Sequence, residues 1–328
     1  MSKYLVVVTD DRYDGRYGEE KEVLGEIDAS LRIYNCTTEK EAVEVVRDAD
    51  GVLVNLFPLG SAVIKEMKKC RVISRYGVGY DNVDIDAATN AGIWVTRVPD
   101  YAIEEVSDQA LALLLGCIRK ISYKDSKIRE GKWNLYKDQL IYRIKGNVLG
   151  LVGFGAISRV LNRKVSGLGL AKILVYDPFL DSTIIEREEG TPVDFNTIIS
   201  ESDYISIHVP LNENTRHMIG RREISNMKRN VILINTSRGP VLDENAVCEG
   251  LQSGKIGYAG LDVFENEPLP AESPLRKLDN VILSDHSGWY SEEAITELKK
   301  KAARNIVEVL CGKNPTYPVN ELKCSQNK

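Results

Sequence analysis

His286 has the sequence context of an acid–base catalyst. It closely follows a short apolar run, residues 281 to 283, that has the composition of a buried strand. A general acid–base catalyst must titrate near neutral pH, and histidine does so. The other two histidines, His208 and His217, are interpreted more simply as residues that form local hydrogen bonds. His286 is therefore the candidate proton donor.

Arg238 is the candidate group for holding a substrate carboxylate. It follows an apolar run, residues 231 to 235, in a turn bounded by glycine. A guanidinium can bind a carboxylate with two hydrogen bonds and polarise the adjacent carbonyl, although a surface salt bridge would use the same residue type. Either Glu265 or Glu267 could orient the His286 ring, and their spacing does not choose between them.

A glycine-rich turn offers a binding site for a dinucleotide. Residues 150 to 158 read Gly-Leu-Val-Gly-Phe-Gly-Ala-Ile-Ser. Gly153 permits a sharp turn out of a strand, and Gly155 lets backbone N–H groups approach a pyrophosphate at the start of the following helix. Ser158 occupies the third glycine position, where its hydroxymethyl group weakens the motif. The predicted cofactor-binding residues of this turn are Gly153, Phe154, Gly155, Ala156 and Ile157.

Asp177 points to NAD rather than NADP. It ends the next apolar run, 22 residues after Gly155, close to the spacing of about 20 expected for a carboxylate that binds the adenosine ribose. Asp177 would repel the 2′-phosphate of NADP, and no arginine follows it at once. A purely structural strand–turn–helix unit is the alternative.

The segment 75 to 82, Arg-Tyr-Gly-Val-Gly-Tyr-Asp-Asn, is a candidate anion site. Two glycines after a strand can expose consecutive backbone N–H groups, which bind carboxylates well. A tight turn before the helix from about Asp84 to Asn90 explains the same residues equally well.

Strand and helix signals alternate along the chain, which predicts parallel sheets. Before the glycine-rich turn we expect strands at 4–8, 51–56 and 72–74 and helices at 39–47 and 61–68, the second capped by Ser61. The strongest helical signal is the apolar segment 100–119, which should be buried.

The second half of the chain continues this alternation. Strands are expected at 148–152, 172–176, 204–209, 231–235, 257–261 and 281–283, and Ser291 can cap a last helix that ends near residue 310. Three of these strands lead into Arg238, Asp262 and His286. The carboxyl-terminal edge of a parallel sheet is where ligands bind, so these residues should lie on one edge.

Composition narrows the class of protein. The 328 residues are enough for about two domains, and the net charge of −5 argues against nucleic acid as the main partner. The six cysteines are far apart without a Cys-x-x-Cys pair, so neither a metal site nor a disulfide framework is expected. The longest apolar run, residues 110 to 115, is too short to cross a bilayer. We expect a soluble cytoplasmic protein without a membrane partner.

Several motifs together resemble the D-isomer-specific 2-hydroxyacid dehydrogenase family. They occur in the expected order between about residues 50 and 312. They are Gly-Phe-Gly-Ala-Ile at 153–157, Asp177, His-Val-Pro-Leu at 208–211, Asn-Thr-Ser-Arg-Gly at 235–239, Gly-Leu-Asp-Val-Phe-Glu-Asn-Glu-Pro at 260–268 and His-Ser-Gly at 286–288.

This resemblance implies a fold of two doubly wound parallel-sheet α/β domains. A Rossmann-type NAD-binding domain, residues 101–289, would be inserted into a split flavodoxin-like substrate domain, residues 1–100 and 290–328. The family also implies a homodimer formed through the cofactor domain.

The resemblance also implies roles for individual residues. Arg238 would hold the substrate, Glu267 would be the acid paired with the histidine, and His286 would give and take the proton. Asp262 would contact the nicotinamide carboxamide, and the amides of Val78 and Gly79 would help to bind the substrate carboxylate. His208, Pro210 and Thr236, in the same motifs, complete the expected cofactor contacts.

Within the family, residues 286 to 291 and Arg75 are most similar to the C-terminal-binding-protein branch, which includes NADH-dependent transcriptional corepressors. An NADH-sensing binding protein with little turnover is therefore the alternative to an enzyme. Asp285 departs from the family pattern, which usually has proline before the histidine, and this bears on the pH optimum.

The substrate side chain is the remaining open point. Trp289 would form an aromatic wall that favours an apolar 2-oxo acid, or it would pack beneath the last helix. Arg75 is the other expected substrate contact. Hydroxypyruvate or a phosphorylated acid is a further possibility, although only Arg71 and Arg75 could hold a phosphate there.

Overall fold

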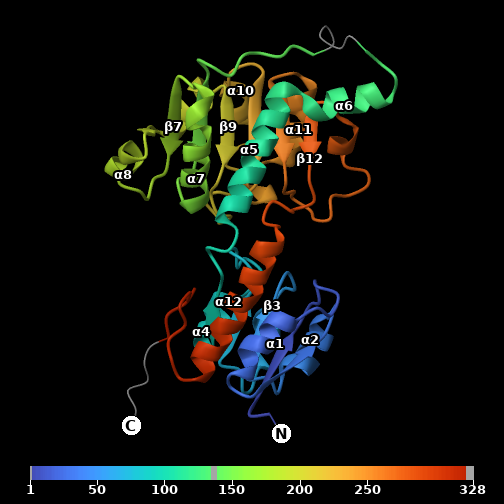
Figure 1. The fold of residues 1–328 in the computed structure, drawn as a ribbon, viewed down its shortest axis with the longest axis vertical. Helices are drawn as coiled ribbons and strands as arrows, with labels where there is room; N and C mark the ends of the chain where they lie inside the picture. Colours follow the sequence, from blue (N-terminus) through green and yellow to red (C-terminus); the bar gives the residue numbers. More distant parts are fainter. Residues whose placement is uncertain (1, 134–138, 323–328) are drawn as a thin grey trace. The chain divides into compact units, whose positions relative to one another are not determined.

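The computed structural model describes residues 2–133 and 139–322, and the chain divides into two compact units. The terminal unit combines residues 1–102 with 291–328, and the central unit comprises residues 103–290. Each unit is an α/β structure built on a single parallel sheet (Figure 1). The predicted fold class, with a Rossmann-type unit inserted into a split second unit, is thus confirmed.

The terminal unit contains a five-stranded parallel sheet in the order β2-β1-β3-β4-β5. Its strands are β1 (Tyr4–Val8), β2 (Ala29–Ile33), β3 (Gly51–Val54), β4 (Val72–Arg75) and β5 (Trp94–Thr96). Its helices are α1 (Gly18–Gly25), α2 (Glu39–Val46), α3 (Ser61–Lys65), α4 (Ile85–Asn90) and α12 (Glu292–Leu310).

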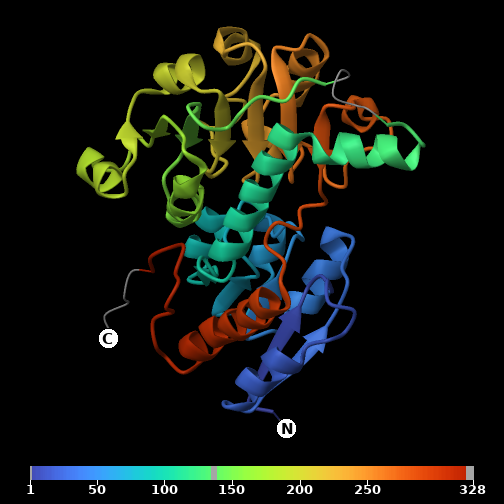
Figure 2. The ribbon, with the colours of Figure 1, turned by 45° about the horizontal axis from the view of Figure 1, so that its top comes forward.

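Helix α12 brings the end of the chain back onto the first sheet. Its Ala302 carbonyl accepts a hydrogen bond of 2.9 Å from the Ser74 hydroxyl of β4, and its Ile306 side chain packs over Gly51 of β3. Figures 1 and 2 show α12 alongside α1 and β3. The Ser291 hydroxyl accepts a hydrogen bond from Ala294 N, as the sequence predicts for the cap of this helix.

The central unit contains a seven-stranded parallel sheet in the order β12-β11-β10-β9-β6-β7-β8. Its strands are β6 (Val148–Val152), β7 (Lys172–Tyr176), β8 (Thr191–Pro192), β9 (Tyr204–Ile207), β10 (Val231–Asn235), β11 (Ile256–Leu261) and β12 (Val281–Leu283). From β6 the chain builds the sheet first toward β8 and then, beginning with β9, in the opposite direction. Open α/β sheets bind ligands at such a reversal of strand order.

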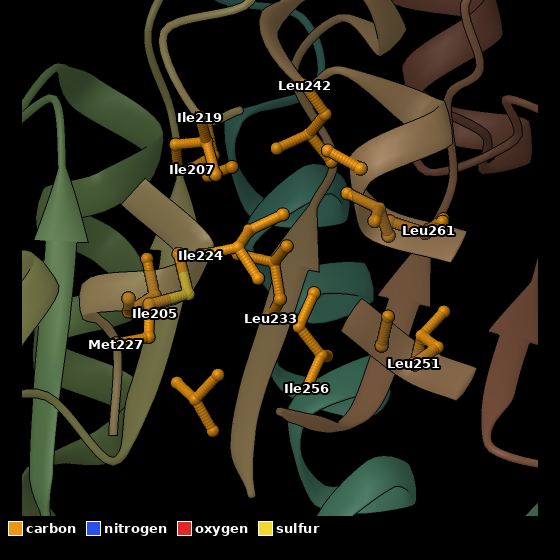
Figure 3. Close-up of a cluster of buried hydrophobic side chains, with 14 of the residues drawn as sticks. Ile205, Ile207, Ile219, Ile224, Met227, Leu233, Leu242, Leu251, Ile256 and Leu261 are labelled. Atoms are coloured by element: carbon orange, nitrogen blue, oxygen red, sulfur yellow. The ribbon is translucent and has the colours of Figure 1, made fainter. Parts of the chain in front are cut away.

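Helices cover both faces of this sheet. On one face, α5 (Ile103–Arg119) packs beside α7 (Ala156–Val165) and crosses β10 and β11 (Figure 1). On the other face, α9 (Phe195–Glu201), α10 (Arg221–Asn226) and α11 (Glu244–Gln252) bury an apolar cluster that includes Ile224, Leu233 and Leu251 (Figure 3). The remaining helices are α6 (Ile121–Arg129), α8 (Ser182–Arg187) and the short η1 (Ser166–Leu168), η2 (Gly239–Val241) and η3 (Pro274–Lys277).

Some predicted bounds differ from the structure for local reasons. The strand expected at 51–56 ends at Val54, because the N–H groups of Asn55, Leu56 and Phe57 donate to the Asp10 carboxylate and not to a neighbouring strand. The helix expected at 61–68 ends at Lys65, and its cap is Gly60 rather than Ser61.

Within the described ranges, no helix combines the length and apolar character needed to span a bilayer. The same residues contain no group of three or more His, Cys, Asp or Glu side chains suited to hold a metal ion. Cys36, Cys70, Cys117 and Cys248 are buried free thiols, whereas Cys311 is exposed. Cys324 lies outside the described residues.

Candidate active site

The loops that follow β10, β11 and β12 carry the predicted catalytic side chains. These three strands are neighbours in the sheet and run parallel, so their carboxyl ends lie on the same edge. Arg238 follows β10, Glu267 follows β11 and His286 follows β12. The structure therefore places all three at the edge that the sequence predicts.

His286 and Glu267 form a close pair. The distance between His286 Nδ1 and Glu267 Oε2 is 2.6 Å, and each side chain is 32% exposed. Phe264 N donates to the other carboxylate oxygen at 3.0 Å. Burial would raise the pKa of Glu267, but the hydrogen bond from His286, the charge of His286, the Phe264 N–H and the charge of Arg238 together lower it. Glu267 is thus held as a carboxylate against the imidazole.

The other candidate acid, Glu265, contacts a different histidine. Its Oε1 lies 2.8 Å from Nε2 of His217. Spacing could not distinguish the two glutamates of this loop, but they have different partners in the structure. Glu267 contacts His286, and Glu265 contacts His217.

The His286 backbone has an unusual conformation. Its φ of +57° lies in the left-handed region, which costs a residue with a side chain on the order of 1 kcal/mol. The His286 N–H donates to the Asp262 carbonyl at 2.9 Å, so the surrounding loop fixes this conformation. The imidazole therefore starts from a defined backbone position.

Asp262 organises the loop that carries His286. Its side chain is buried, and it accepts hydrogen bonds from the Ser284 hydroxyl at 2.6 Å, Gly288 N at 2.9 Å and Ser287 N at 3.2 Å. Burial raises the pKa of Asp262, while these donors and the charge of His286 oppose the rise. The carboxylate predicted to contact the nicotinamide thus also holds the His286 loop.

Gln109 of α5 contacts the candidate site, and the sequence analysis did not single it out. Its amide donates to the Ser284 hydroxyl at 2.9 Å and lies 3.4 Å from Asp262 Oδ1. The sequence offered one signal for it, namely that Gln109 is a polar residue directly before the apolar run at 110–115. Gln109 connects the buried helix with the loop between β12 and His286.

Arg238 is held by its own loop. The side-chain amide of Asn235 donates to the Arg238 carbonyl at 2.9 Å, and Arg238 Nη1 donates to the Ser237 carbonyl at 2.8 Å. A Cβ at Gly239 would lie 1.8 Å from the Phe264 carbonyl carbon, so the backbones of the two loops are in direct contact. This packing brings the positive charge of Arg238 close enough to lower the pKa of Glu267.

The glycine-rich turn between β6 and α7 has the features of a dinucleotide site. Gly153 has a φ of +89°, and a Cβ there would lie 2.9 Å from the His208 carbonyl oxygen. A Cβ at Gly155 would meet no atom within 4 Å, and no side chain caps α7. The start of the helix is thus uncapped and unobstructed at Gly155, which suits a pyrophosphate. Ser158, at the third glycine position, is accommodated in the interior.

Further polar groups complete the fit to NAD. The Asp177 carboxylate accepts hydrogen bonds from Phe154 N at 2.9 Å and Phe179 N at 3.0 Å, which ties it to the turn. Burial lowers the pKa of His208 to about 4, so this ring is neutral near pH 7. The Thr236 hydroxyl oxygen is buried and has no hydrogen-bond partner among the described residues. His208 and Thr236 follow β9 and β10, at the same sheet edge as the turn.

The remaining predicted site residues lie mostly in the terminal unit. The Arg75 side chain is buried at the end of β4 and donates to the Tyr76 carbonyl. Val78 and Gly79 follow in an irregular loop, in which Val78 is 36% exposed. Trp289, at the end of the central unit, packs edge to face with Tyr290, with 5.8 Å between ring centroids.

Comparisons with known proteins agree with this geometry. The family model described as "D-isomer specific 2-hydroxyacid dehydrogenase, NAD binding domain" matches residues 111–288. A glyoxylate reductase of Korarchaeum cryptofilum is 39% identical over 290 residues, which cover 87% of this chain and 86% of the relative. A D-3-phosphoglycerate dehydrogenase of Methanocaldococcus jannaschii is 35% identical over 325 residues, which cover 98% of this chain and 60% of the relative.

A solved structure shows the same likeness. The D-lactate dehydrogenase of Aquifex aeolicus, complexed with NAD and lactic acid, superposes with a TM-score of 0.83 at 26% identity. The match covers 94% of this chain and 96% of that chain. The match to an NAD-binding domain and this NAD complex confirm the predicted cofactor.

Proposed function

Because the chain belongs to the family of D-isomer specific 2-hydroxyacid dehydrogenases, we propose that it interconverts a small 2-oxo acid and the corresponding D-2-hydroxy acid. The observation that carries this proposal is the 2.6 Å contact between His286 and Glu267 on the sheet edge that also bears Arg238. Proton donor, orienting carboxylate and carboxylate-binding cation are the three groups that the reaction needs beside its cofactor.

In the direction of reduction, NADH held by the turn at Gly153 and Gly155 would supply the hydride for C2 of the 2-oxo acid. Arg238 binds the substrate carboxylate and draws electron density from the neighbouring carbonyl. His286 donates its proton to the carbonyl oxygen as negative charge develops there, and Glu267 stabilises the protonated ring and fixes its orientation. In the oxidative direction, His286 takes the proton from the hydroxyl group.

We assign the cofactor contacts to the turn after β6, the end of β7 and the loops after β9, β10 and β11. The turn at Gly153 and Gly155 would receive the pyrophosphate, and Asp177 would bind the adenosine ribose. His208, Pro210, Thr236 and Asp262 would contact the rest of the dinucleotide, with Asp262 at the nicotinamide carboxamide. The exposed start of α7 and the buried Thr236 hydroxyl support this arrangement.

We assign substrate binding in part to the terminal unit. The amides of Val78 and Gly79 would bind the substrate carboxylate, with Arg75 beneath them. Arg71 is committed elsewhere, because its guanidinium donates to the carbonyls of Val309 at 2.9 Å and Leu310 at 3.2 Å at the end of α12. Arg71 would therefore not be available to hold a phosphate, so we favour an unphosphorylated substrate.

A compact acid such as glyoxylate or hydroxypyruvate is the substrate class that we favour. Support comes from the glyoxylate reductase relative, which covers most of this chain. Trp289 would close the side-chain end of the site and extend the preference to apolar 2-oxo acids.

We also propose a homodimer formed through the central unit. Exposed apolar side chains gather on α6 and the segment after it: Ile121, Ile128, Trp133, Leu140 and Tyr142. Figure 2 shows α6 extending away from the end of α5. Such side chains suit burial against a second copy of the chain.

The alternative proposal is an NADH-sensing protein like the corepressors of the C-terminal-binding-protein branch. It would keep the same cofactor residues and the same His286–Glu267 contact. The relatives described above carry the names of reductases and dehydrogenases, which favours turnover.

The deciding measurement is the loss of NADH absorbance with glyoxylate, hydroxypyruvate, pyruvate, a branched-chain 2-oxo acid and phenylpyruvate. Rapid turnover of one acid, lost in Arg238→Ala and His286→Asn, is the expected result. Tight NADH binding with negligible turnover of every acid would instead favour the sensing alternative. Unchanged turnover in Arg238→Ala would overturn the assigned roles.

A further inference from the structure

Glu265 and His217 form a second histidine–carboxylate pair, which the proposed reaction does not use. His217 Nε2 lies 2.8 Å from Glu265 Oε1, and the Glu265 side chain is 25% exposed. Glu265 comes from the loop after β11, two residues before Glu267. His217 comes from the loop after β9. The pair therefore connects the loop of a proposed catalytic carboxylate with a neighbouring loop.

Glu265 also contacts the segment that follows Arg238. Its Oε1 accepts a hydrogen bond of 3.1 Å from Glu244 N, at the start of α11. In return, Glu265 N donates to Glu244 Oε2 at 3.2 Å. These reciprocal bonds join the Glu267 loop to the segment that runs from Arg238 into α11.

Backbone contacts hold the Arg238 loop on two sides. The His217 N–H donates to the Pro240 carbonyl at 2.8 Å. Gly239 packs directly on the backbone of Phe264 and Glu265. Glu265 therefore lies where the loops after β9, β10 and β11 meet. Its Oε1 contacts both His217, from the loop after β9, and Glu244 N, at the start of α11.

We propose that Glu265 is a positioning residue, which sets the distance between Arg238 and the Glu267–His286 pair through His217 and Glu244. This inference rests on the proposed function, because it takes those three side chains as the catalytic groups. A displacement of about 1 Å between reacting groups can lower a rate roughly a hundredfold. Small movements of these loops would therefore matter.

A purely structural role predicts a different outcome. The His217 side chain is 47% exposed, and a salt bridge in such a position contributes little to folding free energy. Loss of the pair should thus reduce turnover while leaving thermal stability almost unchanged. If the pair were purely structural, its loss would lower thermal stability and leave turnover almost unchanged.

The test compares Glu265→Ala, His217→Ala and the double variant in the full-length protein. We expect kcat to fall about tenfold or more in each, with NADH affinity unchanged. The double variant should lose no more than Glu265→Ala, because that single variant already removes the contact with His217. Glu265→Gln should recover most of the turnover, since its amide oxygen can still accept from Glu244 N and contact His217 Nε2. Glu249→Ala on α11, which removes an exposed ion pair with Arg221 of α10, is the matched control.

A second readout requires no turnover. The chain has three histidines, so their ring protons can be followed individually by NMR. Glu265→Ala should shift the His217 and His286 signals and leave those of His208 in place. Wild-type kcat in Glu265→Ala, or unmoved His286 signals, would overturn the inference. If the wild type reduces no 2-oxo acid, the proposed function fails, and the NMR comparison still decides whether Glu265 positions the His286 loop.

Discussion

The proposed chemistry rests on the contact between His286 and Glu267. An imidazole whose backbone has a positive φ is held 2.6 Å from a carboxylate with a lowered pKa. The carboxylate itself is fixed by Phe264 N. The orientation of the proposed proton donor is therefore set by contacts within the chain itself.

Acid should weaken this contact in a defined direction. Because folding lowers the pKa of Glu267 below its ordinary value of 4.5, the contact stabilises the protein above pH 4.5 and is lost as pH falls through the lowered pKa. Glu267→Gln should cost about 1 kcal/mol of unfolding free energy at neutral pH and progressively less below pH 4.5. Denaturant unfolding of both proteins between pH 3 and 7 measures this difference. An equal difference at every pH would contradict the expectation.

Asp177 should set the choice of cofactor. Asp177→Ser removes the carboxylate that would repel a 2′-phosphate, so the preference for NADH over NADPH should fall at least about tenfold. Fluorescence titration with both nucleotides gives the ratio of dissociation constants. Asp181→Ser, which changes an exposed carboxylate at the start of α8, is the control. Retention of the full preference in Asp177→Ser would exclude this role.

The residue types of the site could be read from the sequence more readily than their contacts. His286, Arg238 and Asp177 stand out because each follows an apolar run. Spacing alone could not choose between Glu265 and Glu267, because both lie in one irregular loop whose path depends on packing against Gly239, and only the family resemblance favoured Glu267. Gln109 was missed because its partners are more than 150 positions away in the sequence.

At the scale of single elements, the contact between the loops after β10 and β11 depends on Gly239. Gly239→Ala would place a Cβ inside the backbone of Phe264, and both loops would have to move apart. We expect a loss of about 3 kcal/mol of unfolding free energy, at the upper end of overpacking effects, together with a large loss of turnover. Thermal unfolding and kcat measure the two effects. Gly167→Ala, whose Cβ would meet no atom, should leave both unchanged.

The start of α12 depends on its cap. Ser291→Ala removes the acceptor for Ala294 N and should lower the unfolding free energy by about 1 kcal/mol. Ser291→Asp keeps an acceptor at this position and should preserve stability. Chemical denaturation of the three proteins tests the cap, and equal midpoints for wild type and Ser291→Ala would rule it out.

Elements with strong apolar patterns were predicted with accurate bounds. The strands at 4–8, 148–152, 172–176, 231–235 and 281–283 agree with the structure at both ends. Helix α1 and strand β2 were not predicted, because α1 is mostly polar and β2 is a half-exposed edge strand whose side chains carry little alternation. For such elements, tertiary packing decides the conformation.

At the scale of the whole molecule, the central unit is organised like an independent domain. Helices from residues 103–290 cover both faces of its sheet, and its two apolar clusters contain residues of that segment alone. Expressed by itself, this segment should fold cooperatively and bind NADH but reduce no 2-oxo acid. Circular dichroism melting and NADH fluorescence test this, and an unfolded segment would show that the terminal unit is required.

Helix α12 has a consequence for synthesis on the ribosome. The first five strands emerge early, yet the helix that covers β3 and β4 follows roughly 190 residues later, a delay of about 10 to 40 s at cellular translation rates. During that interval β3 lacks the helix whose Ile306 packs over Gly51, while the central unit can already fold. The sheet of the N-terminal segment should therefore complete its packing only after α12 has been synthesised.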